Sequence, residues 1–227
     1  MYDLYIANKN YSSWSLRPWV LMKALSIPFE ERKHAFPDGA AGETFRKFSP
    51  SGKVPCLHDG DLVVWDSLAI TEYLAESHPQ VWPSEVHARA WARCAAAEMH
   101  SGFGALRDNC SMSCGHRVKL HEIAPALDRD ISRLGELWAE GLTRFGGPFL
   151  AGSSFTAVDA FFAPVAFRIQ SYGLVLPEPA AGYARHLLAV PAMQEWYRDA
   201  LAETWREPSH DREIANNGAV TEDLRAV

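Results

Sequence analysis

Three serine hydroxyls, those of Ser12, Ser13 and Ser15, surround the start of the first predicted helix. Apolar residues recur at helical spacing over 14–25, and Pro18 restricts the helix start to within about one turn before it. A hydroxyl that donates to an anion contributes about 1.5–3 kcal/mol, and a helix N-terminus adds about 0.3–2 kcal/mol. The segment is therefore suited to stabilise an anion, although any of these serines could also be a plain helix cap.

A second polar group follows the last predicted strand of the N-terminal part. Asp66 and Ser67 lie where this strand passes into a helix, so they can hold a charged ligand or simply cap the helix. Lys53 precedes Val54 and Pro55 in a turn, where it can pair with an anion or remain an exposed loop lysine. The sequence thus offers two polar groups, each with a plain structural alternative.

The elements that must position these residues divide into two parts. Strands are predicted over 2–7, 29–36, 54–57 and 62–65, with helices over 14–25, 43–48 and 68–76. Further helices are predicted over 88–107, 123–145, 158–170 and 193–205, and roughly the last twenty residues are polar, either disordered or lying along the surface. We expect an α/β domain over 1–78, a linker over 79–86 and an all-helical domain over 87–227.

Composition excludes several classes of protein. The chain has 227 residues, of which 48% are hydrophobic and 22% charged, an ordinary globular balance. Its net charge of −6 and the lack of a Lys/Arg block argue against a nucleic-acid partner. No apolar run approaches the roughly 18 residues that a membrane span needs, and no secretory signal is recognisable at the start. With only 4 cysteines, we expect a cytoplasmic protein.

One further cluster resembles a metal site only superficially. Cys110, Cys114 and His116 lie close together, but their spacing is not that of the usual paired zinc ligands, so we expect no metal. Thr156 and Asp159 have the spacing of a capping box, which we assign to folding rather than catalysis.

Five segments in this order resemble the cytosolic glutathione transferases. They are Tyr11-Ser12-Ser13-Trp14-Ser15-Leu16-Arg17, Lys53-Val54-Pro55, Asp66-Ser67, Phe149-Leu150-Ala151-Gly152 and Thr156-Ala157-Val158-Asp159. The likeness covers nearly the whole chain, and the first segment is most similar to the zeta and tau classes. It implies the glutathione transferase fold, an α/β thioredoxin-like N-terminal domain followed by an all-α domain.

The resemblance also implies glutathione as co-substrate and assigns roles to the polar residues. A free thiol has a pKa near 8.5, and lowering it by about two units takes roughly 2.7 kcal/mol, which a serine at the helix start can supply. Ser12 is the first choice for the catalytic hydroxyl and Ser13 its rival. The remaining glutathione-binding residues are Ser15, Lys53, Val54 before a cis Pro55, and Asp66 with Ser67 at the γ-glutamyl end.

The helical domain would then supply most of the pocket for an apolar electrophile. Trp14, His100 and Arg107 are its candidate residues, and family members are typically homodimers. Trp14 stands where the zeta class has cysteine, which weakens the case for isomerase activity. Ser12 stands where omega-like members have a nucleophilic cysteine, which argues against disulfide reduction unless Cys56 takes part.

Two alternatives to conjugation remain. A non-catalytic glutathione-binding protein would keep the fold and carry ligands without turnover. A glutathione-dependent isomerase or reductase would begin from the same thiolate, so product analysis is needed to separate it from a transferase.

Overall fold

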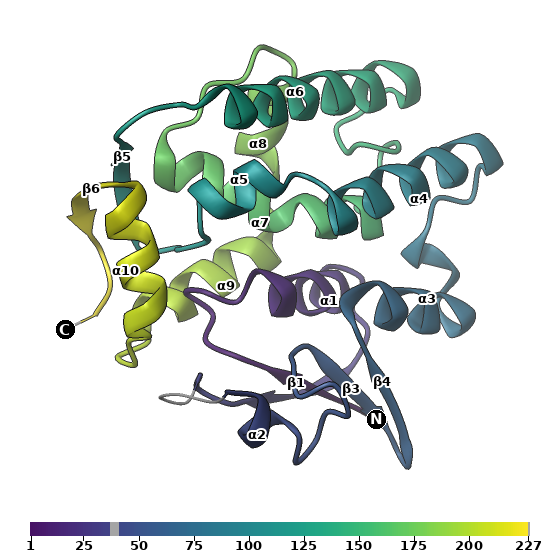
Figure 1. The fold of residues 1–227 in the computed structure, drawn as a ribbon. Helices are drawn as coiled ribbons and strands as arrows, with labels where there is room; N and C mark the ends of the chain where they lie inside the picture. Colours follow the sequence, from purple (N-terminus) through teal and green to yellow (C-terminus); the bar gives the residue numbers. More distant parts are fainter. Residues whose placement is uncertain (37–40, 227) are drawn as a thin grey trace.

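The computed structural model describes residues 1–36 and 41–226. Its N-terminal part is a four-stranded sheet in the order β2-β1-β3-β4, with β1 and β2 parallel and the other pairs antiparallel. The elements are β1 (Tyr2–Ile6), α1 (Ser13–Ala24), β2 (Phe29–Lys33), α2 (Ala41–Phe45), β3 (Cys56–Asp59), β4 (Leu62–Trp65) and α3 (Ser67–Ser77). Figure 1 shows α1 and α3 on one face of this sheet. The predicted thioredoxin-like arrangement is confirmed.

Helices make up most of the remaining chain. A 3₁₀ turn over Pro79–Val81 leads into α4 (Val86–Ser101), α5 (Gly104–Asn109), α6 (Pro125–Phe145), α7 (Ala157–Tyr172), α8 (Ala180–Leu188), α9 (Pro191–Ala202) and α10 (Pro208–Asn217). α7 is buried along almost its whole length, because α1, α4 and α8 all pack against it. The core therefore runs from the sheet through α1 into α7 (Figure 1). None of the helices described has the length and apolarity that crossing a membrane requires.

Helix α1 begins earlier than its proline suggests. It starts at Ser13 with Ser12 as N-cap, and Pro18 lies inside it, more than one turn from the start. The helix tolerates the proline because it is held between the sheet and α7, and Leu16, Trp19 and Val20 are fully buried. Tertiary packing thus outweighs the local effect of the ring.

The helix predicted over 88–107 is interrupted. Phe103 has a left-handed backbone with φ 55, which ends α4 at Ser101 and starts α5 at Gly104. The Arg107 side chain stabilises the break, since its Nε donates to the Gly102 carbonyl at 3.0 Å and its Nη2 donates to the Met99 carbonyl. The apolar periodicity passes through the break, which is why the sequence indicated one helix.

The C-terminal part contains a small sheet that the sequence analysis did not predict. Strand β5 (His116–Leu120) pairs antiparallel with β6 (Gly218–Asp223), with an irregularity at Arg117 and Val118. The polar tail is therefore not disordered: its residues form α10 and β6 and lie against the helical part (Figure 1). Val118 is the one buried apolar residue of β5, since the other buried residue is His116, so the hydrophobic signal for a strand is weak.

The capping box predicted at Thr156 is confirmed. The Asp159 carboxylate accepts hydrogen bonds from the backbone N–H groups of Thr156 at 2.9 Å and Leu150 at 3.0 Å, and from the Tyr183 hydroxyl at 2.8 Å. Asp159 is fully buried, and burial raises its pKa to about 6 against the effect of these hydrogen bonds. Its contacts tie α7 to α8 and to the preceding loop, which is a folding role.

Candidate functional site

Two adjoining cavities lie between the N-terminal part and the helical part. The first, here called the serine cavity, has a volume of about 290 Å³ and is lined by Tyr11, Ser12, Ser13, Trp14, Phe36, Phe45, Gly52, Lys53, Val54, Arg107, Ser111, Met112, Arg168, His210 and Glu213. The second, the aspartate cavity, has a volume of about 390 Å³ and is lined by Trp14, Ser51, Lys53, Val54, Pro55, Trp65, Asp66, Ser67 and His100. Trp14, Lys53 and Val54 belong to both, so one ligand can extend from one cavity into the other.

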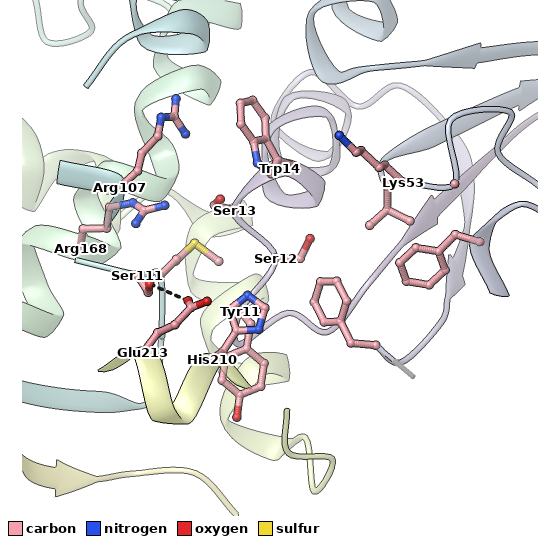
Figure 2. A pocket seen from close by; sticks show the side chains of 15 residues that line it. Tyr11, Ser12, Ser13, Trp14, Lys53, Arg107, Ser111, Arg168, His210 and Glu213 are labelled. Atoms are coloured by element: carbon pink, nitrogen blue, oxygen red, sulfur yellow. Dashed lines mark hydrogen bonds between the residues drawn. The ribbon is translucent and has the colours of Figure 1, made fainter. Parts of the chain in front are cut away.

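Ser12 places a hydroxyl at the N-terminus of α1 and at the wall of the serine cavity (Figure 2). Its Oγ accepts the Ser15 backbone N–H at 3.4 Å and lies 2.7 Å from the Ser15 Oγ, to which it donates. No acidic residue occurs in the first turn of α1, so the positive end of the helix dipole is not neutralised there. This end of α1 favours an anion.

Ser13 and Ser15 differ in access. Ser13 lines the serine cavity beside Ser12 (Figure 2). Ser15 is fully buried and lines neither cavity; its Oγ accepts the Ala7 backbone N–H at 3.1 Å and the Ser12 hydroxyl. The structure thus brings Ser12 and Ser13 to the cavity and places Ser15 behind Ser12, where it can orient the Ser12 hydroxyl.

Asp66 and Ser67 form the start of α3 at one end of the aspartate cavity. Asp66 has a positive φ of 74, and its Oδ1 accepts the Leu68 backbone N–H at 2.8 Å. The Ser67 Oγ is buried and has no hydrogen-bond partner among residues 1–36 and 41–226. A strained backbone and an unpaired buried hydroxyl cost free energy, and both are more common where a ligand binds.

Lys53, Val54 and Pro55 connect the two cavities. The Val54–Pro55 peptide bond is cis, as the resemblance implied. Lys53 is exposed and lines both cavities, whereas Pro55 lines only the aspartate cavity. Figure 2 shows the Lys53 ammonium on the opposite side of the serines from Arg107 and Arg168.

Trp14 occupies the junction between the cavities and lies against two guanidiniums and a histidine ring. The Arg17 and Arg107 guanidiniums lie 4.2 Å and 4.8 Å from its ring centroid, and the His100 ring meets it edge-on at 5.3 Å. The His100 Nε2 lies 3.5 Å from the Asp66 Oδ2. Burial and the nearby Arg17 and Arg107 lower the pKa of His100, against the opposing effect of Asp66. All three electrophile-pocket candidates therefore line a cavity, with His100 on the aspartate side.

Sequence reasoning missed several residues of the serine cavity. Arg168 comes from α7, Ser111 and Met112 from the loop after α5, and His210 and Glu213 from α10. Because these residues lie far from Ser12 along the chain, no local sequence motif connects them to the site. Arg168 could have been noticed, because it is a charged residue within an otherwise apolar helical run.

The cysteines are unpaired and unsuited to nucleophilic chemistry at this site. Burial raises the pKa of Cys56, whose Sγ donates to the Phe48 carbonyl at 3.4 Å, and burial raises the pKa of Cys110 to about 12. The pKa of the fully buried Cys114 is raised further. Across the described residues, no group of three His, Cys, Asp or Glu side chains is arranged to hold a metal ion.

Comparison with known proteins identifies relatives over both parts of the chain. Residues 11–77 match the family described as glutathione S-transferase, N-terminal domain, and residues 115–199 match glutathione S-transferase, C-terminal domain. The chain is 32% identical over 123 residues to a zeta-class glutathione S-transferase of Euphorbia esula, a match covering 53% of this chain and about half, 55%, of that protein. It is 26% identical to a probable maleylacetoacetate isomerase of Caenorhabditis elegans over 88% of this chain and 95% of that protein.

A solved structure supports the same fold. A glutathione transferase homolog from Burkholderia gl BGR1, crystallised with bound glutathione, superposes with a TM-score of 0.64 at 22% identity and covers 88% of this chain and 97% of that chain. At this identity the likeness extends to the fold alone.

Proposed function

Because the chain belongs to the cytosolic glutathione transferase family, we propose that it binds glutathione in the aspartate cavity and presents the thiolate to an electrophile in the serine cavity. The observation that carries this proposal is the continuity of the two cavities through Trp14, Lys53 and Val54. Glutathione has charged ends and a central thiol, and the two cavities offer the unpaired Ser67 hydroxyl and Lys53 for the ends and the Ser12 hydroxyl for the thiol.

Each part of glutathione has a suitable partner. The γ-glutamyl carboxylate meets the N-terminus of α3 and the Ser67 hydroxyl, while its ammonium group faces Asp66. The Val54 backbone holds the cysteine portion in extended form, and Lys53 pairs with the glycine carboxylate. The thiol then lies at the start of α1.

Ser12 and Ser15 act together on the sulfur. A distance of 2.7 Å between their Oγ atoms permits either hydroxyl to donate, because hydroxyl hydrogens rotate. When a thiolate arrives, Ser15 donates to Ser12, and Ser12 turns its own hydrogen to the sulfur. The Ala7 N–H completes the relay by donating to Ser15. A charge-assisted hydrogen bond of about 1.5–3 kcal/mol lowers the thiol pKa by about one to two units.

The reaction transfers an alkyl or aryl group from the electrophile to the sulfur of glutathione. The thiol proton goes to water, the sulfur lone pair forms a C–S bond at the electrophilic carbon, and the leaving group departs with its bonding pair. Such conjugation is a detoxifying reaction. Binding without turnover of any electrophile would support the non-catalytic alternative, and product analysis would reveal isomerisation or reduction.

Calorimetric titration with glutathione tests the proposal. In buffers of different ionisation enthalpy, the unchanged protein should release most of a proton on binding near pH 7, since the bound thiol is then largely ionised. Ser12→Ala should lose most of this release, because the thiol pKa rises by about one to two units. Ser13→Ala is the matched control and should retain it. Retention of the release in both variants would assign the thiolate to the helix terminus rather than to Ser12, and loss in Ser13→Ala alone would assign it to Ser13.

We also propose a homodimer in the cytoplasm. An apolar groove on the N-terminal part, formed by Val63, Val64, Trp65, Leu68 and Ala69, has a volume of about 630 Å³ and is open to solvent. Trp65 is 45% exposed, and it lines both this groove and the aspartate cavity, so a partner subunit seated there would border the glutathione site. Unpaired cysteines are compatible with a reducing compartment.

A further inference from the structure

Two arginines form one wall of the serine cavity. Arg107 from α5 and Arg168 from α7 line it together, and Figure 2 shows both guanidiniums across Ser13 from Lys53. Arg168 is fully enclosed, with 4% of its surface exposed. Charged side chains are seldom buried unless a partner neutralises them, so such a wall calls for an explanation.

Neither guanidinium has an ion-pair partner in the described part of the chain, although Asp108 and Asp130 favour the charge of Arg107 from farther away. Within the described residues no carboxylate lies within ion-pair distance of Arg107 or Arg168, and the Arg168 Nε is buried without any hydrogen-bond partner. Arg168 donates from Nη1 to the Cys110 carbonyl, a neutral acceptor. The carboxylate of the cavity wall, that of Glu213, is exposed and accepts the Ser111 hydroxyl at 3.1 Å.

A third arginine increases the excess of positive charge. Arg17 is buried behind Trp14, and its Nε and Nη1 have no partner in the part of the chain described. Burial and the neighbouring Arg107 and Arg168 hold the pKa of Arg17 well below its usual range. The Arg168 pKa is lowered to about 10 by burial and by Arg107. The three cations destabilise one another, and an anion between them would relieve that repulsion.

The structural role of Arg107 at the break between α4 and α5 explains only part of the buried arginine cluster. Arg107 uses its Nε and one Nη2 hydrogen on the Gly102 and Met99 carbonyls, which leaves its Nη1 donors for the cavity. That role does not account for the buried, unpaired Nε of Arg168.

We propose that the second substrate carries a carboxylate, which Arg107 and Arg168 bind on the side of the serine cavity opposite Lys53. This inference rests on the proposed function and adds a charge to the apolar electrophile expected from the sequence. With its carboxylate on the arginines, an aryl halide acid directs its halogen-bearing carbon toward the thiolate at Ser12. The sulfur lone pair forms the C–S bond, the halide leaves with the C–halogen pair, and the carboxylate is unchanged.

A matched pair of ligands tests the charge. The conjugates of glutathione with 4-chloro-3-nitrobenzoate and with its methyl ester differ in that charge and one methyl group, so their dissociation constants are measured by calorimetry next to that of glutathione. The carboxylate conjugate should bind at least about tenfold more tightly than the ester conjugate, since one charge-assisted hydrogen bond accounts for such a factor. Turnover of the two chlorides, each divided by its uncatalysed rate, should show the same preference.

Substitution of the arginines tests whether they cause the preference for the carboxylate conjugate. Arg107→Met keeps the packing on Trp14 but removes the charge, and it should reduce the carboxylate preference to less than about threefold; Arg107→Lys should restore part of it. Arg168→Met should reduce the carboxylate preference in the same way. If Arg168→Met does not fold, Arg107→Met and Arg107→Lys are sufficient to test the site. Arg133→Met is the matched control, because Arg133 is exposed on α6 and bonds to Glu98.

The outcomes separate the two proposals. If the unchanged protein binds no glutathione, the proposed function fails. If it binds glutathione but binds the ester conjugate as tightly as the carboxylate conjugate, the function stands and the carboxylate site is wrong. Retention of the full preference in Arg107→Met and Arg168→Met would likewise overturn the site.

Discussion

At the scale of single residues, His100 shows how the site controls charge. Its ring contacts the Asp66 carboxylate, and burial together with the charges of Arg17 and Arg107 lowers its pKa despite that carboxylate. Histidine in an unfolded chain titrates near 6.5. His100 is therefore neutral at pH 7, and its 3.5 Å contact with Asp66 is not an ion pair there.

Titration of His100 by NMR checks that the ring is neutral at pH 7. Its ring resonances should give a pKa below 6.5, and Asp66→Asn should lower the value further because the Asp66 charge that favours the protonated ring is lost. The folded form takes up this proton less readily than the unfolded form, so His100 should reduce stability as the pH falls below about 6.5. A His100 pKa above 7 would show that Asp66 outweighs burial and the arginines.

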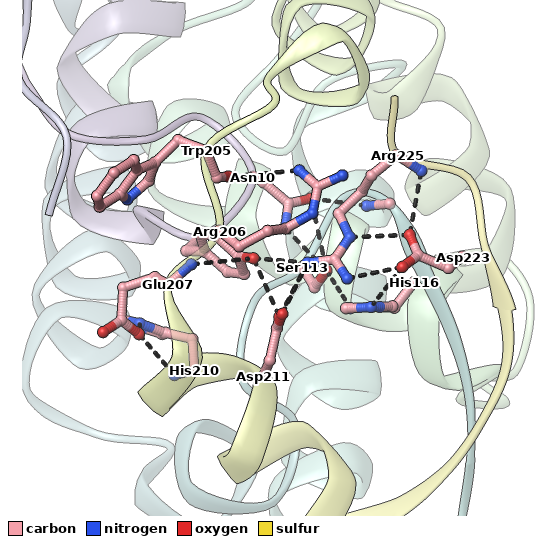
Figure 3. A network of polar contacts seen from close by, with 12 residues as sticks. Asn10, Ser113, His116, Trp205, Arg206, Glu207, His210, Asp211, Asp223 and Arg225 are labelled. Atoms are coloured by element: carbon pink, nitrogen blue, oxygen red, sulfur yellow. Dashed lines mark hydrogen bonds and ion pairs between the residues drawn. The ribbon is translucent and has the colours of Figure 1, made fainter. Parts of the chain in front are cut away.

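At the scale of elements, α10 completes the serine cavity, and β6 follows it directly in the chain. α10 contributes His210 and Glu213 to the wall, and Arg225, just after β6, ties the segment to the start of α1. Its guanidinium donates to the Tyr11 hydroxyl at 2.6 Å, to Asp211 at 2.9 Å and to Asp223 at 2.7 Å (Figure 3). Tyr11 itself lines the cavity, so this network links the tail to the site.

Replacement of Arg225 should loosen this segment alone. In Arg225→Met, hydrogen exchange over 208–223 should become about tenfold or more faster, since hydrogen bonds to charged groups contribute about 1.5–3 kcal/mol. Exchange in β1 and β3 should not change. Arg212→Met, an exposed arginine on the same helix, is the control and should exchange like the unchanged protein. Faster exchange throughout the chain would instead make the network part of the global fold.

At the scale of the whole molecule, the apolar groove of Val63, Val64, Trp65, Leu68 and Ala69 is the feature that the chain leaves uncovered. Ala69 is exposed on α3, so a glutamate there is easily accommodated in a monomer but would place a charge in an interface.

Light scattering after size-exclusion chromatography measures the oligomeric state. The unchanged protein should have the mass of two chains, and Ala69→Glu should shift it toward one chain, with a dissociation constant raised at least about tenfold. Ala215→Glu, at an exposed position of α10, should remain dimeric. A monomeric unchanged protein would disprove the dimer and leave the glutathione site to a single chain.

Most of the fold could be predicted because its signals are local. Alternating apolar residues mark β1, the Asp59-Gly60 turn marks the β3–β4 hairpin, and Thr156 with Asp159 marks the start of α7. Short, polar elements such as α10, β5 and β6 carry no such pattern and form through tertiary contacts. Helix α8 was not predicted although its buried residues, Ala180, Tyr183, Ala184 and Leu187, recur at helical spacing, because the element is short.

The site was predictable mainly in its N-terminal half, with His100 and Arg107 the candidates from the helical part that also line a cavity. Ser12, Lys53 and Asp66 belong to contiguous motifs that a sequence displays directly, and their roles remain predictions. Arg168 and Glu213 reach the serine cavity through the packing of α7 and α10, which no local motif specifies. The burial of Ser15 also depends on tertiary packing, since three neighbouring serines look alike in a sequence.

The left-handed backbone of Asp66 lowers the stability of the fold, while its side chain supplies a carboxylate to the ligand site. At φ 74 a non-glycine residue costs about 1–3 kcal/mol, whereas glycine adopts such angles freely and sacrifices only a few tenths of a kcal/mol as an N-cap. A change to glycine would therefore make the protein more robust while removing the carboxylate from the cavity. Laboratory selection of this protein for heat tolerance alone would therefore favour variants that are more stable but no longer bind the ligand.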